Sequence, residues 1–439
     1  MRDPVGRRLE RRAKRALLPL ACRLFASRDA RDLRSLSEAA RVLVVRQDNR
    51  LGNLVLLSPL LQALRILAPS ARIALLAGDR YGAIMSGCPW IDELIVERKR
   101  WLIRHLYAYP GFLRGIRAQK WDVVFEASNP DTHSFYNAFL SVVSGAPHRV
   151  GFFHPRSQEA LNRPVRPPGR ECHYSLAPLL LLTAFGDEPP LLPMRLPPML
   201  EELASRSRDA CAAAPLVVHP GARGAKRWPA ERFAHLLETL SFDGPIVLIG
   251  ERRDAPLLNE LSQACKGRAQ ARPLDDLSAL VSTLGGARAY VGCDTGPMHI
   301  AAALGLPILA LFLTSNPLRY APLEPRSETL LLGERSRAYA AADNSLAQAR
   351  GFDRAEEEEL HSPRFPQQRA FFERVAAARP RLAAGPEGAD HRAEVAFVRE
   401  RLSALLERSA SVGERPAIPP AFAIPTGPSM ERRNPEAGV

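Results

Sequence analysis

The segment at residues 291–312 constrains the fold most, because it places polar residues where an apolar strand passes into a helix. Residues 287–292 predict a buried strand. Asp294 or Thr295 can cap the helix, and Pro297 suits the first helical position because it lacks an amide hydrogen. Gly305 predicts the end of this short helix. The segment therefore predicts a strand–turn–helix unit of an α/β sheet.

The predicted start of this helix is a candidate anion site. Free backbone amides at Gly296, Met298 and His299 would point outward at the positive end of the helix dipole. The hydroxyl of Thr295 and the imidazole of His299 would lie beside them, an arrangement that suits a diphosphate. An ordinary capped helix between two core strands, which binds nothing, explains this segment equally well.

A second segment, residues 216–240, repeats the arrangement and shifts the balance toward a ligand site. Gly221 and Gly224 allow the backbone to approach a ligand closely. Lys226 and Arg227 follow as cationic donors, just before the next helix opens. Both loops leave the carboxyl ends of strands, where open α/β sheets bind ligands. The alternative interpretation is a solvated basic loop.

Length and charge narrow the class of protein. The chain has 439 residues, 46% of them hydrophobic, which suits a two-domain enzyme. The net charge of +13 indicates an anionic partner. Basic residues crowd the first 15 positions ahead of a leucine-rich stretch, so residues 1–40 are either a basic arm that contacts an anionic membrane surface or a solvated tail.

Other features exclude several functions. Basic and aromatic residues mix between positions 98 and 120, but the helical spacing of leucines there and the lack of any nucleic-acid-binding motif argue against a nucleic-acid partner. The six cysteines are scattered without a CxxC pair, so neither a zinc site nor a disulfide framework is expected. No secretory signal is apparent, which favours the cytoplasm.

The alternation of strands and helices predicts two doubly wound, Rossmann-like α/β domains that face a cleft. A proline-rich stretch separates them and the periodicity weakens after them. The expected divisions are a basic arm (1–40), an acceptor-binding domain (41–185), a linker (186–213), a nucleotide-sugar-binding domain (214–335), a partly helical extension (336–411) and a disordered tail (412–439).

At this point three motifs together resemble glycosyltransferase family 9, the lipopolysaccharide heptosyltransferases. They are the opening at residues 44–65, the HPGA…KRWP loop at residues 219–229 and the DTGPMHIAAALG segment at residues 294–305. The resemblance covers about residues 41–325. It implies the B-type glycosyltransferase fold and an inverting transfer of a sugar from a nucleotide donor, with neither metal nor other cofactor.

The resemblance also assigns the donor side of the site. Lys226 matches the lysine that binds the donor phosphate. A diphosphate and sugar-binding turn is matched by Asp294, Thr295, Gly296 and His299. Gly221 belongs to the same phosphate loop, and Glu251 falls near the acidic residue placed by the nucleoside. For Glu251, a solvated loop glutamate is the alternative.

The first motif departs from the family pattern. The family's Gly-Asp supplies a carboxylate that acts as general base, whereas this chain has Gly52-Asn53. Asparagine cannot accept a proton. We therefore predict that Asp48, earlier in the same loop, deprotonates the acceptor, or that Asn53 positions the acceptor while another group acts. Asp48 can also simply brace the loop.

The resulting prediction is a transferase that moves heptose from ADP-heptose to an anionic, lipid-linked saccharide of the lipopolysaccharide core. Arg98, Lys99 and Arg100 are candidates to hold the anionic groups of this acceptor. The expected location is the cytoplasm, with possible contact to the inner face of the membrane through the basic arm. A nucleotide-sugar epimerase of similar fold and a non-catalytic nucleotide-sugar-binding subunit are the alternatives.

Overall fold

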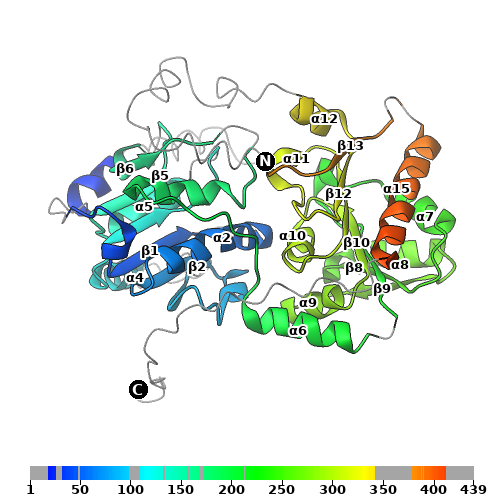
Figure 1. Ribbon diagram of the computed structural model, residues 1–439, viewed down its shortest axis with the longest axis horizontal. Helices are drawn as coiled ribbons and strands as arrows, with labels where there is room; N and C mark the ends of the chain where they lie inside the picture. The colour runs from blue at the N-terminus through cyan, green and yellow to red at the C-terminus, as the bar shows by residue number, and fades with distance from the viewer. Residues whose placement is uncertain are drawn as a thin grey trace.

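The computed structural model consists of two lobes placed side by side, each built around one sheet (Figure 1). It describes residues 18–25, 32–47, 50–97, 109–131, 134–155, 158–168, 172–211, 213–341, 378–386, 388 and 390–411. The chain up to residue 17, the tail beyond residue 411 and two of the predicted site segments, Asp48 and Arg98 to Arg100, lie outside these residues.

The first sheet is parallel throughout and has the strand order β3-β2-β1-β4-β5-β6. Its strands are β1 (Arg41–Arg46), β2 (Arg72–Gly78), β3 (Glu93–Glu97), β4 (Val123–Glu126), β5 (His148–Phe152) and β6 (Arg163–Val165). The chain proceeds from β1 to β3 in one direction and then crosses to β4 on the other side of β1. The carboxyl ends of β1 and β4 thus form the topological switch point, where such sheets bind ligands.

Helices cover both faces of this sheet, because alternate residues of β1 point to opposite sides. Val42 and Val44 belong to a core that includes α2 (Leu51–Leu67), whereas Leu43 and Val45 pack on the other face, toward α4 (Tyr109–Ala118) and α5 (Phe135–Val143). The helix α2 carries buried side chains along almost its whole length. Burial on both faces explains why the strands are almost continuously apolar.

The second sheet repeats this plan with the order β13-β12-β11-β10-β7-β8-β9, again parallel. Its strands are β7 (Leu216–His219), β8 (Ile246–Gly250), β9 (Ala269–Pro273), β10 (Ala289–Cys293), β11 (Ile308–Phe312), β12 (Glu328–Leu331) and β13 (Leu382–Ala384). Here the switch point lies between β7 and β10. The doubly wound α/β class predicted from the sequence is confirmed.

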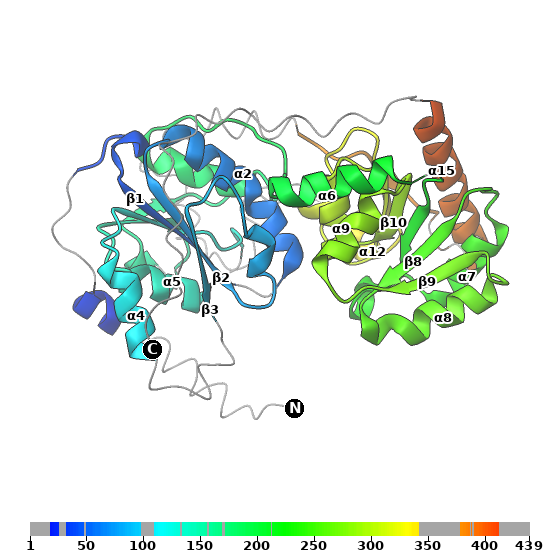
Figure 2. The ribbon, with the colours of Figure 1, turned by 90° about the horizontal axis from the view of Figure 1, so that it is seen from below.

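Helices α6 (Pro198–Asp209), α7 (Ala230–Thr239), α8 (Ala255–Ala264), α9 (Leu277–Gly285), α10 (Gly296–Ala303), α11 (Pro317–Tyr320), α12 (Glu334–Ala341) and α15 (His391–Ser411) surround this sheet. Figure 2 shows α6 leading from the first lobe along the second. It packs so closely on α9 that a Cβ atom at Gly285 would lie 2.4 Å from the carbonyl oxygen of Ala204. The predicted linker thus contains a helix that packs on the second lobe.

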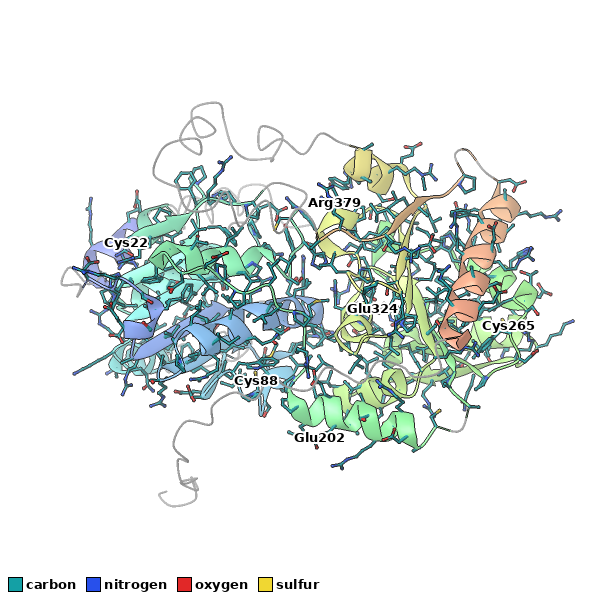
Figure 3. All side chains as sticks on the ribbon, viewed as in Figure 1. Cys22, Cys88, Glu202, Cys265, Glu324 and Arg379 are labelled. Carbon is teal, nitrogen blue, oxygen red and sulfur yellow. The ribbon has the colours of Figure 1, made fainter. Side chains whose placement is uncertain are left out.

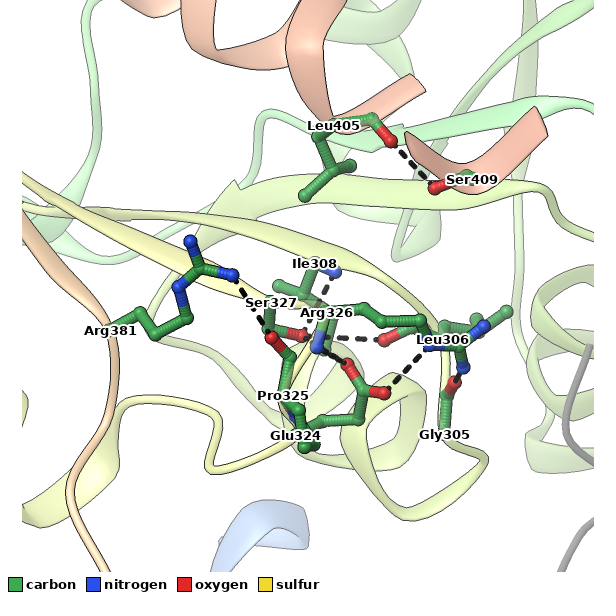
Figure 4. Close-up of polar contacts among 10 residues, drawn as sticks. All are labelled: Gly305, Leu306, Ile308, Glu324, Pro325, Arg326, Ser327, Arg381, Leu405 and Ser409. Atoms are coloured by element: carbon green, nitrogen blue, oxygen red, sulfur yellow. Dashed lines mark hydrogen bonds and ion pairs between the residues drawn. The ribbon is translucent and has the colours of Figure 1, made fainter. Parts of the chain in front are cut away.

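One apolar cluster passes through both lobes and includes Leu57 and Leu60 of α2 and Met298 and Ile300 of α10. Helix α2 follows β1 and helix α10 follows β10, and each of these strands borders the switch point of its sheet. The contact between the two helices therefore sets how the two sheets face each other. The loop before β12 holds the far end of α10: Arg326 Nη2 donates to the carbonyl of Gly305 at 2.5 Å, and Ser327 Oγ accepts from the amide of Ile308 at 3.1 Å (Figure 4).

All six cysteines lie in the described part of the chain and are free thiols. Figure 3 shows Cys22, Cys88 and Cys265 on separate elements of the fold. No helix among the described residues is long and apolar enough to cross a membrane.

The stretch predicted as a partly helical extension, residues 336–411, supplies β13 and α15 to the second lobe. Strand β13 extends the sheet beside β12, and Val395, Val398 and Leu402 of α15 are buried in its outer core. A buried polar contact fixes α15: Glu394 Oε1 accepts from Trp228 Nε1 at 2.6 Å and from the guanidinium of Arg232. This carboxylate joins the carboxyl-terminal helix to the loop that carries Lys226.

Replacing Glu394 with alanine is expected to destabilise the second lobe by about 1–3 kcal/mol, because it leaves the buried Trp228 N–H and the Arg232 guanidinium without their acceptor. Chemical denaturation followed by Trp fluorescence measures this. Glu400→Ala, at an exposed position of the same helix, is the matched control and is expected to change stability by less than about 0.5 kcal/mol. Equal effects of the two variants would contradict the role assigned to Glu394.

Candidate active site

The turn between β10 and α10 forms as the sequence predicts. Strand β10 ends at Cys293, Thr295 is the N-cap residue of α10, and Pro297 lies in its first turn. The helix ends at Ala303, and Gly305 follows with a φ of +69°, in the left-handed region that favours glycine. The proline in the first turn and the glycine after the last turn both favour this helix start and this helix end.

Asp294 is the buried centre of the site, with a side chain only 6% exposed. Its Oδ2 atom accepts from Lys226 Nζ at 2.6 Å and from Ser315 Oγ at 2.6 Å. On the other side, His299 Nε2 lies 3.5 Å from Oδ1. Burial by itself would raise the pKa of Asp294, but the hydrogen bond from His299 and the charge of Lys226 outweigh it and hold the pKa well below the ordinary value. The carboxylate is therefore ionised at neutral pH.

Lys226 reaches this carboxylate from the short helical turn η6 (Gly224–Lys226), and its side chain remains 44% exposed. Its ammonium also lies over the ring of Tyr320, 5.7 Å from the centroid. The cation is thus held at the edge of the site and still open to a ligand. The structure brings together Lys226, Asp294 and His299, which the sequence predicts as one donor site.

The hydroxyl of Thr295 makes no capping hydrogen bond to the first turn of α10 in the described part of the chain. It instead contacts His219 Nδ1 and the carbonyl of Cys293, each at 3.2 Å. The Thr295 side chain thus does not occupy the first-turn amides of α10, which lie at the positive end of the helix dipole. Burial lowers the pKa of His219 to about 4, so this ring is neutral at pH 7. The sequence did not single out His219, although it stands at the start of the HPGA motif.

Gly221, in the loop after β7, lies close to the side chains of His219 and Asp254. A Cβ atom there would lie 3.1 Å from His219 Nε2 and 3.3 Å from Asp254 Oδ2. Glu251 forms a reciprocal capping box with Asp254 at the start of the short helix η7 (Arg252–Asp254). Its carboxylate also contacts Arg253 at 2.9 Å and, from the other lobe, Arg80 at 3.7 Å. A role of Glu251 toward the nucleoside stays a prediction.

The first lobe meets this site through the start of α2. A Cβ atom at Gly52 would lie 2.5 Å from Cδ2 of the His299 ring, and one at Gly296 would lie 3.1 Å from Cβ of Leu51. The two helices therefore meet with their amino-terminal turns in contact, which only glycine permits at position 52. Asn53, the next residue, is buried. The structure does not test the catalytic roles predicted for Asn53 and Asp48.

A second polar contact joins the lobes beside the predicted donor site. Asp131, in the loop after β4, accepts hydrogen bonds from the hydroxyl of Tyr174 and from the guanidinium of Arg319 in α11. Arg319 also donates to the Tyr174 hydroxyl at 2.8 Å. The ring of Tyr320, next in the chain, packs edge-on against Tyr174 with centroids 4.8 Å apart. No motif marks these residues, because their contacts join two loops and α11, which are far apart in the sequence.

A family model described as glycosyltransferase family 9 (heptosyltransferase) matches residues 111–348, more than half of the chain. The chain belongs to glycosyltransferase family 9. This glycosyltransferase is 25% identical over 304 residues to lipopolysaccharide heptosyltransferase 2 of Escherichia coli strain K12, and the alignment covers 64% of this chain and 85% of that protein.

Two solved structures share the fold. A family 9 glycosyltransferase from Veillonella parvula DSM 2008 superposes with a TM-score of 0.57 at 23% identity, covering 66% of this chain and 86% of that one. The E. coli heptosyltransferase WaaC with ADP also gives a TM-score of 0.57, at 16% identity, covering 84% and 99%. The glycosyltransferase thus has the B-type fold that the sequence resemblance implied.

The Gly52→Ala variant is expected to lose transfer activity by about 10- to 100-fold, because the added methyl group collides with a buried His299 ring and displaces either the ring or α2. Steady-state turnover measures this loss. Gly111→Ala is the control, since a Cβ atom in that helix meets no atom within 4 Å. Full activity of Gly52→Ala would show that the contact between the two helices does not shape the site.

Proposed function

We propose that this glycosyltransferase moves heptose from ADP-heptose to an acceptor of the lipopolysaccharide-core type, with inversion and without a metal ion. The E. coli relative is named a lipopolysaccharide heptosyltransferase, and a protein of the same fold has been solved with ADP. The observation that carries the proposal is the convergence of Lys226, Asp294 and His299 at the amino terminus of α10.

On the donor side, Lys226 and the first-turn amides of α10 would bind the diphosphate. Negative charge grows on the diphosphate as the sugar departs, and a preorganised cation with helix amides stabilises that charge. Asp294 keeps the ammonium of Lys226 at the edge of the cleft. Thr295, Gly296 and His299 would contact the phosphates and the sugar, Gly221 would admit them closely, and Glu251 would face the nucleoside.

On the acceptor side, the first lobe would present a hydroxyl group to the anomeric carbon. A base takes the hydroxyl proton as the oxygen attacks, the new glycosidic bond forms, and the bond to the diphosphate breaks with its electron pair on the leaving ADP. Attack from the side opposite to the leaving group inverts the anomeric centre. The contact between Gly52 and His299 places the start of α2 next to the donor site, where this attack would occur.

We propose Asp48 as that base, since Asn53 cannot take a proton and could only position the acceptor. The Asp48→Asn variant is expected to lose transfer by about 100-fold or more while it binds ADP unchanged, because general-base catalysis contributes about 10²–10⁴-fold. Turnover and calorimetric titration with ADP measure the two quantities. Full activity would show that Asp48 only braces its loop.

The acceptor is proposed to be lipid-linked and anionic, met at the inner face of the cytoplasmic membrane. Leu20 and Leu24 support this, because they are 50% and 64% exposed on the helix at residues 18–25, within the basic arm and directly after its most basic stretch. Arg98, Lys99 and Arg100 would hold anionic groups of the acceptor. Co-sedimentation with anionic and neutral vesicles tests the membrane contact, and equal binding to both would oppose it.

Calorimetric titration with ADP, UDP, GDP and dTDP tests the donor. We expect selective ADP binding, weakened at least about tenfold in Lys226→Ala because a direct charge-assisted contact to phosphate is lost. Preference for another nucleotide would exclude ADP-heptose. Binding without transfer or donor hydrolysis would favour a non-catalytic subunit, and conversion of the donor alone would favour an epimerase.

A further inference from the structure

A buried glutamine directly after β1 has no side-chain hydrogen-bond partner among the residues that the structure describes. Gln47 is 3% exposed, and neither its Nε2 nor its Oε1 atom has a partner in the described part of the chain. Native proteins rarely leave a buried amide in this state, because its lost hydrogen bonds to water are not replaced. Such a side chain calls for a ligand or another specific reason.

The position of Gln47 connects it to the next strand. Residues Val45 and Glu126 are register partners in β1 and β4, and the backbone amide of Ala127 donates to the carbonyl of Val45 at 3.0 Å. Continuing this register by two residues places Gln47 beside Ser128, on the same face as Val45 and Glu126. This is the switch point of the first sheet, the location at which a doubly wound sheet binds its ligand.

Glu126 and Ser128 lie on this face and Asn137 lies on α5, which packs over it. Together with Gln47 we call these three residues the β1–β4 polar cluster. The hydroxyl and the amide of Ser128 both donate to Glu126 Oε1, the amide at 3.2 Å. Asn137 Nδ2 donates to Ser128 Oγ at 2.9 Å, but its Oδ1 atom has no partner in the described residues. Burial raises the pKa of Glu126, although the Ser128 hydroxyl opposes this effect.

The open positions of this cluster select a kind of ligand. Two are acceptor oxygens, Gln47 Oε1 and Asn137 Oδ1, and one is a donor, Gln47 Nε2. A phosphate dianion has no proton to give to an acceptor oxygen, and two of the three open positions are acceptor oxygens. A sugar hydroxyl can both donate and accept.

We propose that the β1–β4 polar cluster binds hydroxyl groups of the saccharide acceptor, so that Gln47 and Asn137 help to select its sugar. The proposal rests on the proposed function, since it specifies the acceptor side of that reaction. It separates recognition of the sugar, at the switch point, from recognition of anionic groups elsewhere on the acceptor.

The chain contains a matched comparison for Gln47. Gln62 in α2 is also buried, at 8% exposure, but its Nε2 atom donates to the carbonyls of Ser58 and Pro193. A glutamine with satisfied bonds holds the fold, and its loss should destabilise the protein. A buried glutamine without partners costs free energy in the unliganded protein. Its replacement by an apolar residue should therefore leave the stability unchanged or raise it.

The experiment compares Gln47→Leu and Gln62→Leu in the full chain, with Gln47→Met as a second variant of similar size. Thermal unfolding without ligand gives stability. Calorimetry gives affinity for ADP and for the oligosaccharide released from lipopolysaccharide core, used both with its phosphates and after dephosphorylation.

For Gln47→Leu and Gln47→Met we expect an unchanged or raised Tm, by up to about 4 °C, with oligosaccharide affinity reduced about tenfold or more. The loss should be the same for both oligosaccharide forms, and ADP affinity should not change. Gln62→Leu should lower the Tm and leave oligosaccharide affinity unaltered.

Unchanged oligosaccharide affinity in the Gln47 variants would overturn the proposal, as would a fall in their Tm like that of Gln62→Leu. Binding that disappears on dephosphorylation but ignores Gln47 would assign recognition to the phosphates instead. If the wild type binds ADP but neither oligosaccharide, the proposal of a lipopolysaccharide-core acceptor is wrong. The proposed hydroxyl-binding site is then wrong as well.

Discussion

The predicted donor site depends on one buried carboxylate, that of Asp294. A charge taken out of water is unfavourable unless other groups compensate it. The compensation comes from three elements: Lys226 from the loop after β7, His299 from α10 and Ser315 from the loop after β11. Because all three converge on the same two oxygen atoms, their loops take one arrangement. That arrangement leaves a half-exposed cation beside the amino terminus of α10.

The second constraint is the close approach of the two lobes. Each sheet offers its switch point to the space between them, and the first turns of α2 and α10 touch at Gly52 and Gly296. The contact of Asp131 and Tyr174 with Arg319 adds a polar contact between the two lobes. The first lobe is thereby set against the predicted donor site, and the β1–β4 polar cluster lies at the carboxyl end of its own sheet.

The sequence predicted those parts of the fold that local patterns control. Continuous apolar runs predicted the parallel strands, because these strands are buried on both faces. Pro297 and Gly305 predicted the limits of α10, because the backbone preferences of proline and glycine act within a few residues. The grouping of Lys226 with Asp294 and His299 came from motifs. Contacts between segments far apart in the sequence had no such signal. The contacts of Asp131 with Arg319 and of Glu394 with Trp228 depend on how the helices and loops pack once they have formed. The close contact at Gly52 was likewise visible only in three dimensions.

The central claim is that Asp294 prepares Lys226 to bind a nucleotide diphosphate. A double-mutant cycle on ADP affinity, with Lys226→Ala, Asp294→Asn and the double variant, tests it most directly. We expect Asp294→Asn to weaken ADP binding although asparagine keeps the shape, and the double variant to bind about as weakly as Lys226→Ala alone, which gives a coupling of about 1 kcal/mol or more. Additive losses would show that the two residues act independently and would contradict the account.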